Sequence, residues 1–177
     1  MFNFSGNKKH IKVTDIVWMT QDAKWNGLLQ RWKKDHPVIL CWFEATLQDL
    51  QSWFSNETGA AESLLLASHI HPSQLSDKSI VFAEHYPLRK KETELFERLQ
   101  PAEIVIHSAL DEPLFTRFGG DRIIRMMKQM GMAAEESLQH TMISQAILHA
   151  QEKIEKKVPN ESLATSAGEW MERNMRS

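Results

Sequence analysis

Short runs of consecutive apolar residues recur along the first two thirds of the chain. They cover residues 38–43, 64–68, 80–83 and 104–106. Runs of this length that are apolar at successive positions predict strands covered on both faces, as in a parallel sheet. The last run consists of isoleucine and valine, whose branched side chains favour strand structure. We therefore expect four buried strands.

Apolar residues at helical spacing fill the intervals between these predicted strands. They predict helices over residues 22–34, 46–54 and 89–99. Strand and helix therefore alternate, which favours an α/β fold with a mostly parallel sheet flanked by helices. Before the first helix, the polar residues 1–13 are expected to form a loose arm or an edge strand, and residues 16–18 form a short apolar patch.

Two short helices are expected after the last of these strands. Asp111 is a suitable N-cap for the first helix, which has Pro113 in its first turn. Gly119 and Gly120 are expected to end this helix, because glycine adopts the left-handed conformation at little cost. Asp121 can cap the second helix. The segment therefore predicts a compact joint between the sheet and the residues that follow.

The pattern after residue 133 is purely helical. One apolar stripe predicts a long helix and consists of Leu138, Met142, Ile143, Ile147, Ala150 and Ile154. Pro159 is expected to end that helix, and a last helix is expected around residues 163–171. We therefore predict a truncated α/β domain over residues 1–132 and a helical extension over residues 133–177 that packs on it.

The joint and the long helix also contain an ordered series of residues that resembles a known family. The series consists of Leu110, Asp111, Glu112, Leu114, Phe118, Gly119, Asp121, Arg122, Ile123, Gly131 and Met132, followed by His140, Met142, Ser144, Ala146, Ile147, Ala150, Gln151 and Lys153. It is similar to the end of the ATPase motor of SecA, the preprotein translocase, where the second RecA-like motor domain enters the helical scaffold. The resemblance implies a RecA-like (P-loop-NTPase-like) sheet with a helical tail and a link to protein transport. Activity has to be inferred from the site itself.

The resemblance does not extend to the family's ATPase motifs. The family follows an Ile-Ala-Thr strand end with Gly-Arg-Gly-Thr-Asp, whereas this chain has Leu-Ala-Ser-His-Ile-His-Pro at residues 66–72. The family's arginine motif is reduced to Arg98, and Glu94 stands in place of its glutamine. None of the seven glycines precedes Lys-Ser or Lys-Thr, so the sequence contains no P-loop. We therefore expect no ATP hydrolysis by this chain alone and no cofactor, which argues against an enzyme.

Composition and charge narrow the class of protein further. The formal net charge of the 177 residues is −2, which gives no electrostatic basis for binding nucleic acid or an anionic membrane. Cys41 is the single cysteine, so no internal disulfide can form, as expected in a reducing compartment. The sequence has neither an apolar stretch of membrane-spanning length nor a secretory signal. We therefore expect a cytoplasmic protein without integral membrane association.

The first functional hypothesis is a non-catalytic SecA-motor-like protein that binds a protein partner as an accessory module. The candidate contact residues are Arg122, Met126, Met127, Met130 and Met142. Flexible thioether side chains suit adaptable binding surfaces. The same spacing is also typical of the buried face of a helix, and both interpretations stay open. A homo-oligomer is also compatible with the sequence.

The second hypothesis is a regulator that responds to a nucleotide or phosphate and acts with a partner ATPase. The candidate residues are Glu84, Arg89, Lys90 and Arg98. Arginine and lysine pair with phosphate, and Arg98 could act on a nucleotide held by another subunit. A charged cluster of this kind is also typical of a solvated helix face.

The third hypothesis is a metal-dependent enzyme. His69, His71 and His85 lie at or near the ends of predicted strands, and α/β sheets bind ligands at the carboxyl ends of their strands. Imidazole nitrogen is a common metal ligand. Because no carboxylate is known to orient these rings, polar residues in ordinary loops explain the pattern as well.

Overall fold

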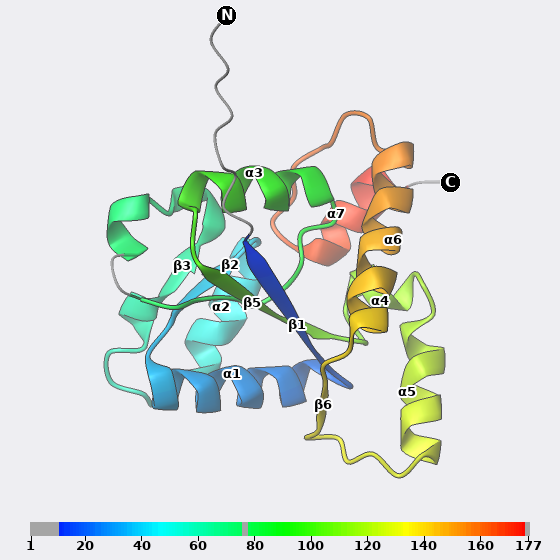
Figure 1. The fold of residues 1–177 in the computed structure, drawn as a ribbon, viewed down its shortest axis with the longest axis horizontal. Helices are drawn as coiled ribbons and strands as arrows, with labels where there is room; N and C mark the ends of the chain where they lie inside the picture. The colour runs from blue at the N-terminus through cyan, green and yellow to red at the C-terminus, as the bar shows by residue number, and fades with distance from the viewer. Residues whose placement is uncertain (1–10, 76–77, 176–177) are drawn as a thin grey trace, which may run out of the picture.

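A mostly parallel sheet forms the centre of the molecule (Figure 1). The computed structural model describes residues 11–75 and 78–175. Within these residues the sheet has six strands in the order β3-β2-β4-β5-β1-β6. The strands are β1 (Lys12–Trp18), β2 (Val38–Cys41), β3 (Leu64–Leu66), β4 (Ile80–Phe82), β5 (Glu103–Ala109) and β6 (Ser137–Leu138). Neighbouring strands are parallel except β1 and β6, which are antiparallel. The predicted α/β class is confirmed, and the arrangement is consistent with a RecA-like fold.

Helices cover both faces of the sheet. They are α1 (Gln21–Asp35), α2 (Glu44–Trp53), α3 (Arg89–Leu99), α4 (Pro113–Thr116), α5 (Gly120–Gln129), α6 (Thr141–Lys157) and α7 (Ala167–Asn174), with 3₁₀ turns at Ala61–Ser63, Ala67–His69 and Pro72–Leu75. Trp25 of α1 and Leu50 of α2 share a buried cluster with Ile39 on one face. Leu95 of α3 shares another with Leu40 on the opposite face. Within the described ranges, none of these helices combines the length and the apolar character that crossing a membrane requires.

The C-terminal third of the chain packs on the sheet at two places (Figure 1). Met127 of α5 and Ile147 of α6 join Val17 of β1 in one buried cluster. Trp170 of α7 is completely buried and shares a second cluster with Phe43, which follows β2. Burial of side chains this large contributes roughly 1.5–3 kcal/mol each, so both contacts fix the helices firmly to the sheet.

Strand β1 corrects the expectation for the start of the chain. Its seven residues pair in parallel register with β5, and β6 pairs on its other side. Residues 12–13 are therefore not a loose arm; they pair with β5 on one side only, because β6 pairs with Val17 and Trp18 alone, so the edge-strand alternative fits them. Polar Lys12, Thr14 and Asp15 interrupt the apolar run that would have predicted a strand, although Asp15 is buried. Residues 1–10 of the predicted arm lie outside the described residues.

The segment after residue 133 was expected to be purely helical, but it is not. Ser137 and Leu138 form β6, which pairs with the end of β1. Helix α6 starts only after His140, whose Nδ1 accepts the backbone N–H of Met142 at 3.2 Å. Leu138 fits the apolar stripe of α6 by spacing, so periodicity alone includes it in the helix. Pairing with β1 satisfies backbone groups at the edge of the sheet, which outweighs three more residues of helix.

The predicted N-caps in the joint are displaced by one or two residues. Glu112 precedes α4, whereas the predicted cap Asp111 accepts the backbone N–H of Gln21 at 3.1 Å. Gly119, with φ of 92°, precedes α5, and Asp121 lies inside the first turn of that helix. Neither helix has a side-chain N-cap, so both predicted caps are wrong. Asp121 in the first turn still favours α5 through the helix dipole.

Three other element ends differ from the prediction. The first predicted strand ends early, at Cys41, because Phe43 already precedes α2. The second ends at Leu66, where a 3₁₀ turn begins. The last helix begins at Ala167 rather than near residue 163. Each of the two strands ends at a local turn or cap although the apolar run continues. The last helix begins at its own cap, after the first apolar residues of its run.

Substitution of Gly120 by alanine should destabilise the protein. The added Cβ would clash with the backbone oxygen of Leu110, so that α5 or the end of β5 has to shift. We expect the free energy of unfolding to fall by about 1–3 kcal/mol. Urea denaturation followed by circular dichroism measures this change.

Gly168→Ala is the matched control, because Gly168 also lies in the first turn of a helix. The nearest atoms to its added Cβ are at 3.9 and 4.0 Å, which is ordinary contact. Alanine is the better helix former, so this variant should be unchanged or up to about 1 kcal/mol more stable. Equal losses in the two variants would contradict the close approach of α5 to Leu110.

Candidate functional site

A buried ion pair lies at the carboxyl ends of the parallel strands. Lys24 of α1 is 1% exposed; its Nζ donates to the backbone oxygen of Ala83 at 2.7 Å and pairs with Glu112. Burial raises the pKa of Glu112, and Lys24 opposes that shift. Because a buried charge is tolerated only with a partner, each group holds the other in place. The pair joins α1 to the segment between β5 and α4.

Glu84 follows β4 and uses both carboxylate oxygens within the protein. One oxygen accepts the backbone N–H groups of Trp42 and Phe43 at 3.0 and 3.1 Å, and the hydroxyl of Thr46 donates to the other at 2.7 Å. Burial raises the pKa of Glu84 to about 7, although Lys24 and Thr46 favour the ionised form. The side chain therefore connects the end of β4 to the start of α2.

His85 lies between two buried carboxylates. Its Nε2 is 3.1 Å from Oδ1 of Asp15, and its Nδ1 is 2.9 Å from Oε1 of Glu92. Burial alone would lower the pKa of the imidazole, but Glu92 and Asp15 together raise it to about 10. The ring is therefore a cation at neutral pH. Glu92 also accepts a bond from the side-chain amide of Gln151 at 2.9 Å, so this ion cluster links β1, β4, α3 and α6.

Little space remains beside the ends of β4 and β5. A cavity of about 150 Å³ lies among Lys24, Glu84 and Glu112 and is closed by α4 and by Ser166 and Met171 near or in α7. Sites for small organic ligands typically measure about 300–1,000 Å³. The part of the carboxyl edge at the ends of β4 and β5, an edge at which α/β sheets usually bind ligands, is therefore largely filled by the chain's own side chains.

The residues predicted to contact phosphate do not form one cluster. Glu84 is buried. Arg89 pairs with Glu152 at 3.6 Å, and the backbone N–H of Lys90 donates to a carboxylate of α6 at 2.7 Å. Arg98 is exposed at the far end of α3, about 14 Å along the helix axis from Arg89. The structure does not bring the two arginines together.

The three predicted metal ligands have different surroundings. His69 is exposed in a 3₁₀ turn. The exposed His71 has its Nδ1 2.8 Å from the hydroxyl of Ser73, and both ring nitrogens of His85 bind carboxylates. Over residues 11–75 and 78–175, no group of three or more His, Cys, Asp or Glu side chains is arranged to hold a metal ion.

A second cavity, of about 450 Å³, lies beside the ends of β2 and β3. Trp42 and Tyr86 form its aromatic wall. The Tyr86 hydroxyl donates to Glu161 at 2.7 Å, and Lys91 pairs with the same carboxylate at 3.1 Å. Because these opposite charges neutralise each other, the cavity has no clear preference for a charged ligand.

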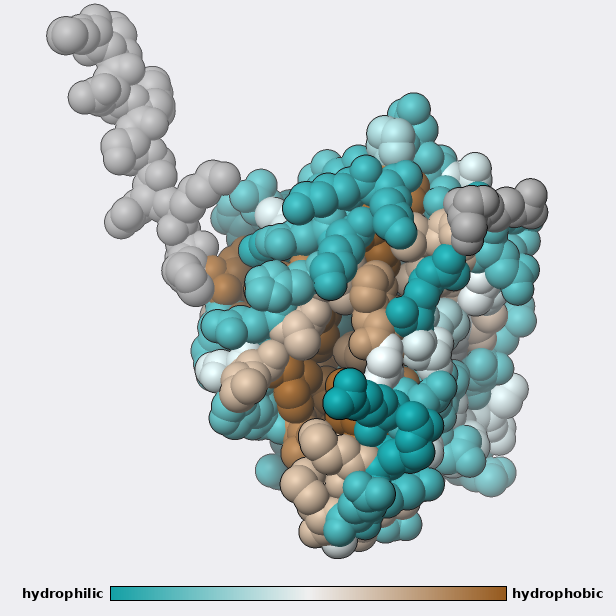
Figure 2. Space-filling view, turned by 90° about the vertical axis from the view of Figure 1, so that its right-hand side faces the viewer, coloured by the Kyte–Doolittle hydropathy of each residue, from teal (hydrophilic) through white to brown (hydrophobic). Residues whose placement is uncertain are grey.

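An apolar groove opens between α5 and α6 and has a volume of about 370 Å³. We call it the methionine groove; its walls include Ile123, Met126, Met130, Met142, Ile143 and Ala146, and its floor includes Val17, Met127 and Ile147. Figure 2 shows apolar residues gathered around a hollow on this side of the molecule, bordered by hydrophilic ones. The groove is therefore an apolar surface open to water above a packed floor.

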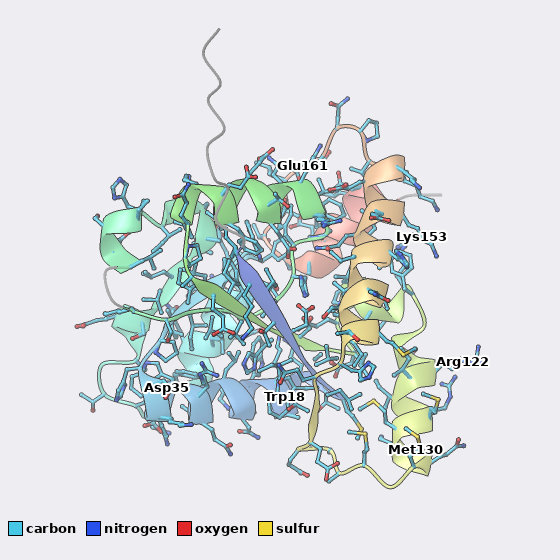
Figure 3. The ribbon with its side chains drawn as sticks, viewed as in Figure 1. Trp18, Asp35, Arg122, Met130, Lys153 and Glu161 are labelled. Atoms are coloured by element: carbon cyan, nitrogen blue, oxygen red, sulfur yellow. The ribbon has the colours of Figure 1, made fainter. Side chains whose placement is uncertain are left out.

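The predicted contact residues divide between the core and this surface. Met127 is 1% exposed and belongs to the floor, so the core interpretation holds for it. Met126, Met130 and Met142 are 52%, 64% and 70% exposed in the walls. Arg122 projects outward from α5 (Figure 3) and is not among the residues that line the groove. The structure thus brings methionines from two separate helices to one surface.

Sequence reasoning missed part of the groove. Phe118 and Ile123 also line it and are 36% and 37% exposed. The signal for Ile123 was present, because it lies three and seven residues before Met126 and Met130 on the same helix face. Ile143 was assigned to the apolar stripe of the long helix, but spacing could not show that this stripe faces α5.

Part of the chain is similar to SecA. It is 28% identical over 114 residues to the protein translocase subunit SecA of Acinetobacter baylyi, which is 62% of this chain and 12% of that protein. The SecA of Acinetobacter baumannii is 30% identical over 98 residues, covering 53% and 10%, and that of Psychrobacter arcticus is 25% identical over 117 residues, covering 64% and 13%. No family model matches the chain. The chain contains a SecA-related region, and its match spans about a tenth of the length of these relatives.

Glu84→Gln should reduce the pH dependence of stability. The pKa of Glu84 rises from 4.5 to about 7 on folding, so the folded state binds this proton more tightly. The resulting stabilisation is complete below pH 4.5 and is lost as the pH rises through 7. Across this window the native protein should lose roughly 3 kcal/mol relative to the variant. Urea denaturation of both proteins at about pH 5 and about pH 8 measures the difference, and parallel profiles would contradict the buried carboxyl described here.

His85→Leu should be severely destabilised at neutral pH. The substitution leaves Asp15 and Glu92 buried without the cation between them, which costs about 3–5 kcal/mol. Lys12→Ala is the control, because the ion pair of Lys12 with Glu103 at 2.6 Å is exposed and should contribute little to stability. Chemical denaturation of both variants provides the comparison. A loss of similar size in both would show that His85 carries no charge.

Proposed function

We propose that this chain is a non-catalytic SecA-motor-like protein that binds a protein partner through the methionine groove, as an accessory module linked to protein translocation. The observation that carries the proposal is the groove itself. Its walls expose Met126, Met130 and Met142 to water above a fully packed floor. Covering apolar surface is favourable by roughly 25 cal/mol per Å², and contiguous exposed apolar surfaces often mark interaction sites.

The residue types of the walls favour a protein partner. Methionine has three rotatable bonds and a polarisable sulfur, so it adapts to side chains of different shape. A groove made from two helices is also the usual receptor for a peptide segment of another protein. The exposed methionines therefore provide adaptable contacts, whereas Met127, fixed in the floor, keeps the groove open in the free protein.

Two further observations support a role without catalysis. The sequence has no P-loop. The ends of β4 and β5 are occupied by the Lys24–Glu112 pair and by Glu84. The polar atoms of these side chains bond to other groups of the protein. Helix α7 then covers this edge with Trp170 buried beneath it. A triphosphate bound at the ends of β4 and β5 would have to displace both the ion pair and helix α7.

The proposal gives each predicted domain a part in the groove. In this proposal α5 belongs to a RecA-like scaffold within residues 1–132, and α6 belongs to an extension within residues 133–177 that also adds β6 to the sheet. The link to translocation comes from the relatives, which are named protein translocase subunits and match this chain over a small part of their length. We place the protein in the cytoplasm, as the cysteine content led us to expect.

Photo-crosslinking tests the proposal in cells that express the full chain. With p-benzoylphenylalanine in place of Met130, we expect a covalent adduct with a protein partner, identified by mass spectrometry. The additional change Met142→Glu should reduce its yield by about tenfold or more, because it places a charge in the apolar wall facing the partner. Thermal unfolding of each variant shows whether the fold is retained.

The control is the same probe in place of Leu163, which is 73% exposed and lies outside the groove. It should not give the adduct formed from position 130. The same adduct from both positions, or insensitivity to Met142→Glu, would contradict binding at the groove. Turnover of ATP by the purified chain would contradict the non-catalytic role.

A further inference from the structure

We propose that the methionine groove is a site of reversible oxidation: a hydroperoxide converts the exposed thioethers of Met126, Met130 and Met142 to sulfoxides, and this weakens binding of the protein partner. The inference rests on the proposed function and adds a regulation of the same site. Two independent observations lead to it: the positions of the methionines that water reaches, and the burial of the single cysteine.

Strongly exposed methionine is confined to the groove. Over residues 11–75 and 78–175, the methionines that are more than half exposed are Met126, Met130 and Met142, and all three line the groove. Met132 also lines it and is half-buried. The other methionines of these ranges are 0–7% exposed and are Met19, Met127, Met171 and Met175. A dissolved oxidant therefore reaches thioether sulfur at this one surface.

The single cysteine does not compete for the oxidant. A thiol reacts through its thiolate, so an accessible cysteine with a low pKa is normally the first sulfur to be oxidised. Cys41 lies in β2 and is 0% exposed, and burial raises the pKa of its thiol well above the ordinary value. It is therefore neither accessible nor ionised at neutral pH. The reactive sulfur of the described residues is thus the thioether sulfur of the groove walls.

The oxidation transfers one oxygen atom and two electrons. The thioether sulfur attacks one peroxide oxygen and supplies the electron pair, so that an S–O bond forms and the O–O bond breaks. The leaving oxygen takes the proton of the transferred hydroxyl and departs as water, or as an alcohol if the oxidant is an organic hydroperoxide. Methionine sulfoxide reductases reverse the change; two thiols are oxidised to a disulfide, and the oxygen leaves as water.

Sulfoxides would change the walls from apolar to polar. The residues that line the groove carry no polar or charged side chain, so a sulfoxide oxygen covered by a partner finds no side-chain donor on this chain. A polar group that is buried without a hydrogen bond lowers affinity. Met126 lies on α5, Met130 follows one turn later at its end, and Met142 lies on α6. Oxidation therefore affects both walls.

The fold is protected from the same reaction. Met127 of the groove floor is 1% exposed and packs with Val17 and Ile147 in a buried cluster. An oxidant in water does not reach its sulfur while the protein is folded. The walls can therefore be oxidised and reduced again above a floor that does not change.

Peroxide treatment of the purified full-length chain tests where oxidation occurs. Tandem mass spectrometry measures, for each methionine, the fraction that has gained one oxygen atom at graded concentrations of hydrogen peroxide. Met126, Met130 and Met142 should react about tenfold faster or more than Met19 and Met127, because susceptibility follows exposure. Equal rates at exposed and buried positions, or loss of the folded circular dichroism spectrum, would overturn the inference.

Photo-crosslinking tests the consequence for binding. Purified chain with p-benzoylphenylalanine in place of Met130 is oxidised, freed of peroxide, mixed with untreated cell lysate and illuminated. The yield of the partner adduct should fall about tenfold or more relative to the untreated protein. Methionine sulfoxide reductases with dithiothreitol should restore it.

Met126→Leu combined with Met142→Leu is the matched control in the same protein. Leucine keeps the walls apolar at similar volume and cannot form a sulfoxide. Peroxide should therefore leave the yield of this variant unchanged. An equal loss of yield in the variant, or an undiminished yield from protein with sulfoxides at both positions, would overturn the inference.

These results distinguish the inference from the proposed function. In each overturning case the untreated protein still forms the adduct, so binding at the groove stands. Absence of the adduct from untreated protein would contradict the proposed function, and with it the effect of oxidation on binding, even if mass spectrometry finds the expected order of oxidation.

Discussion

The ion cluster of Asp15, His85 and Glu92 is the interaction on which the rest of the structure depends. It connects β1, β4 and α3 through side chains that are almost completely buried. Removal of His85 leaves two carboxylates without their cation in a medium that solvates them poorly, so separation of these elements costs free energy. Glu92 also binds Gln151 of α6, and α6 is one wall of the methionine groove. The same cluster that fixes the sheet therefore sets the position of the candidate binding surface.

Polar groups from several elements converge on the carboxyl edge of the sheet at the ends of β4 and β5. Ligands bind at this edge in open α/β sheets because loops and helix termini converge on it. In this chain the converging groups bind each other: Lys24 pairs with Glu112, and Glu84 accepts backbone N–H groups from the start of α2. These contacts and the buried Trp170 of α7 stabilise the fold at this part of the edge.

The methionine groove combines a rigid floor with adaptable walls. Met127 and Ile147 belong to a buried cluster with Val17 of β1, so the floor is as fixed as the sheet. Met126, Met130 and Met142 stand above it and are largely exposed. Apolar burial would supply most of the affinity in such a site, because it scales with the area that is covered.

The sequence by itself determined the α/β class, the order of most helices and strands, and the likeness to SecA, because continuous apolar runs and helical spacing are local properties. It did not determine strand β1, whose Asp15 is polar and yet buried beside His85, or β6, whose Leu138 also fits a helical stripe. The candidate site was predicted only in part, since spacing identified Met126, Met130 and Met142 but not whether they face the core or water. Only the tertiary structure decided that, because exposure and ion pairing depend on contacts between elements that are far apart in the sequence. A local sequence pattern does not specify those contacts.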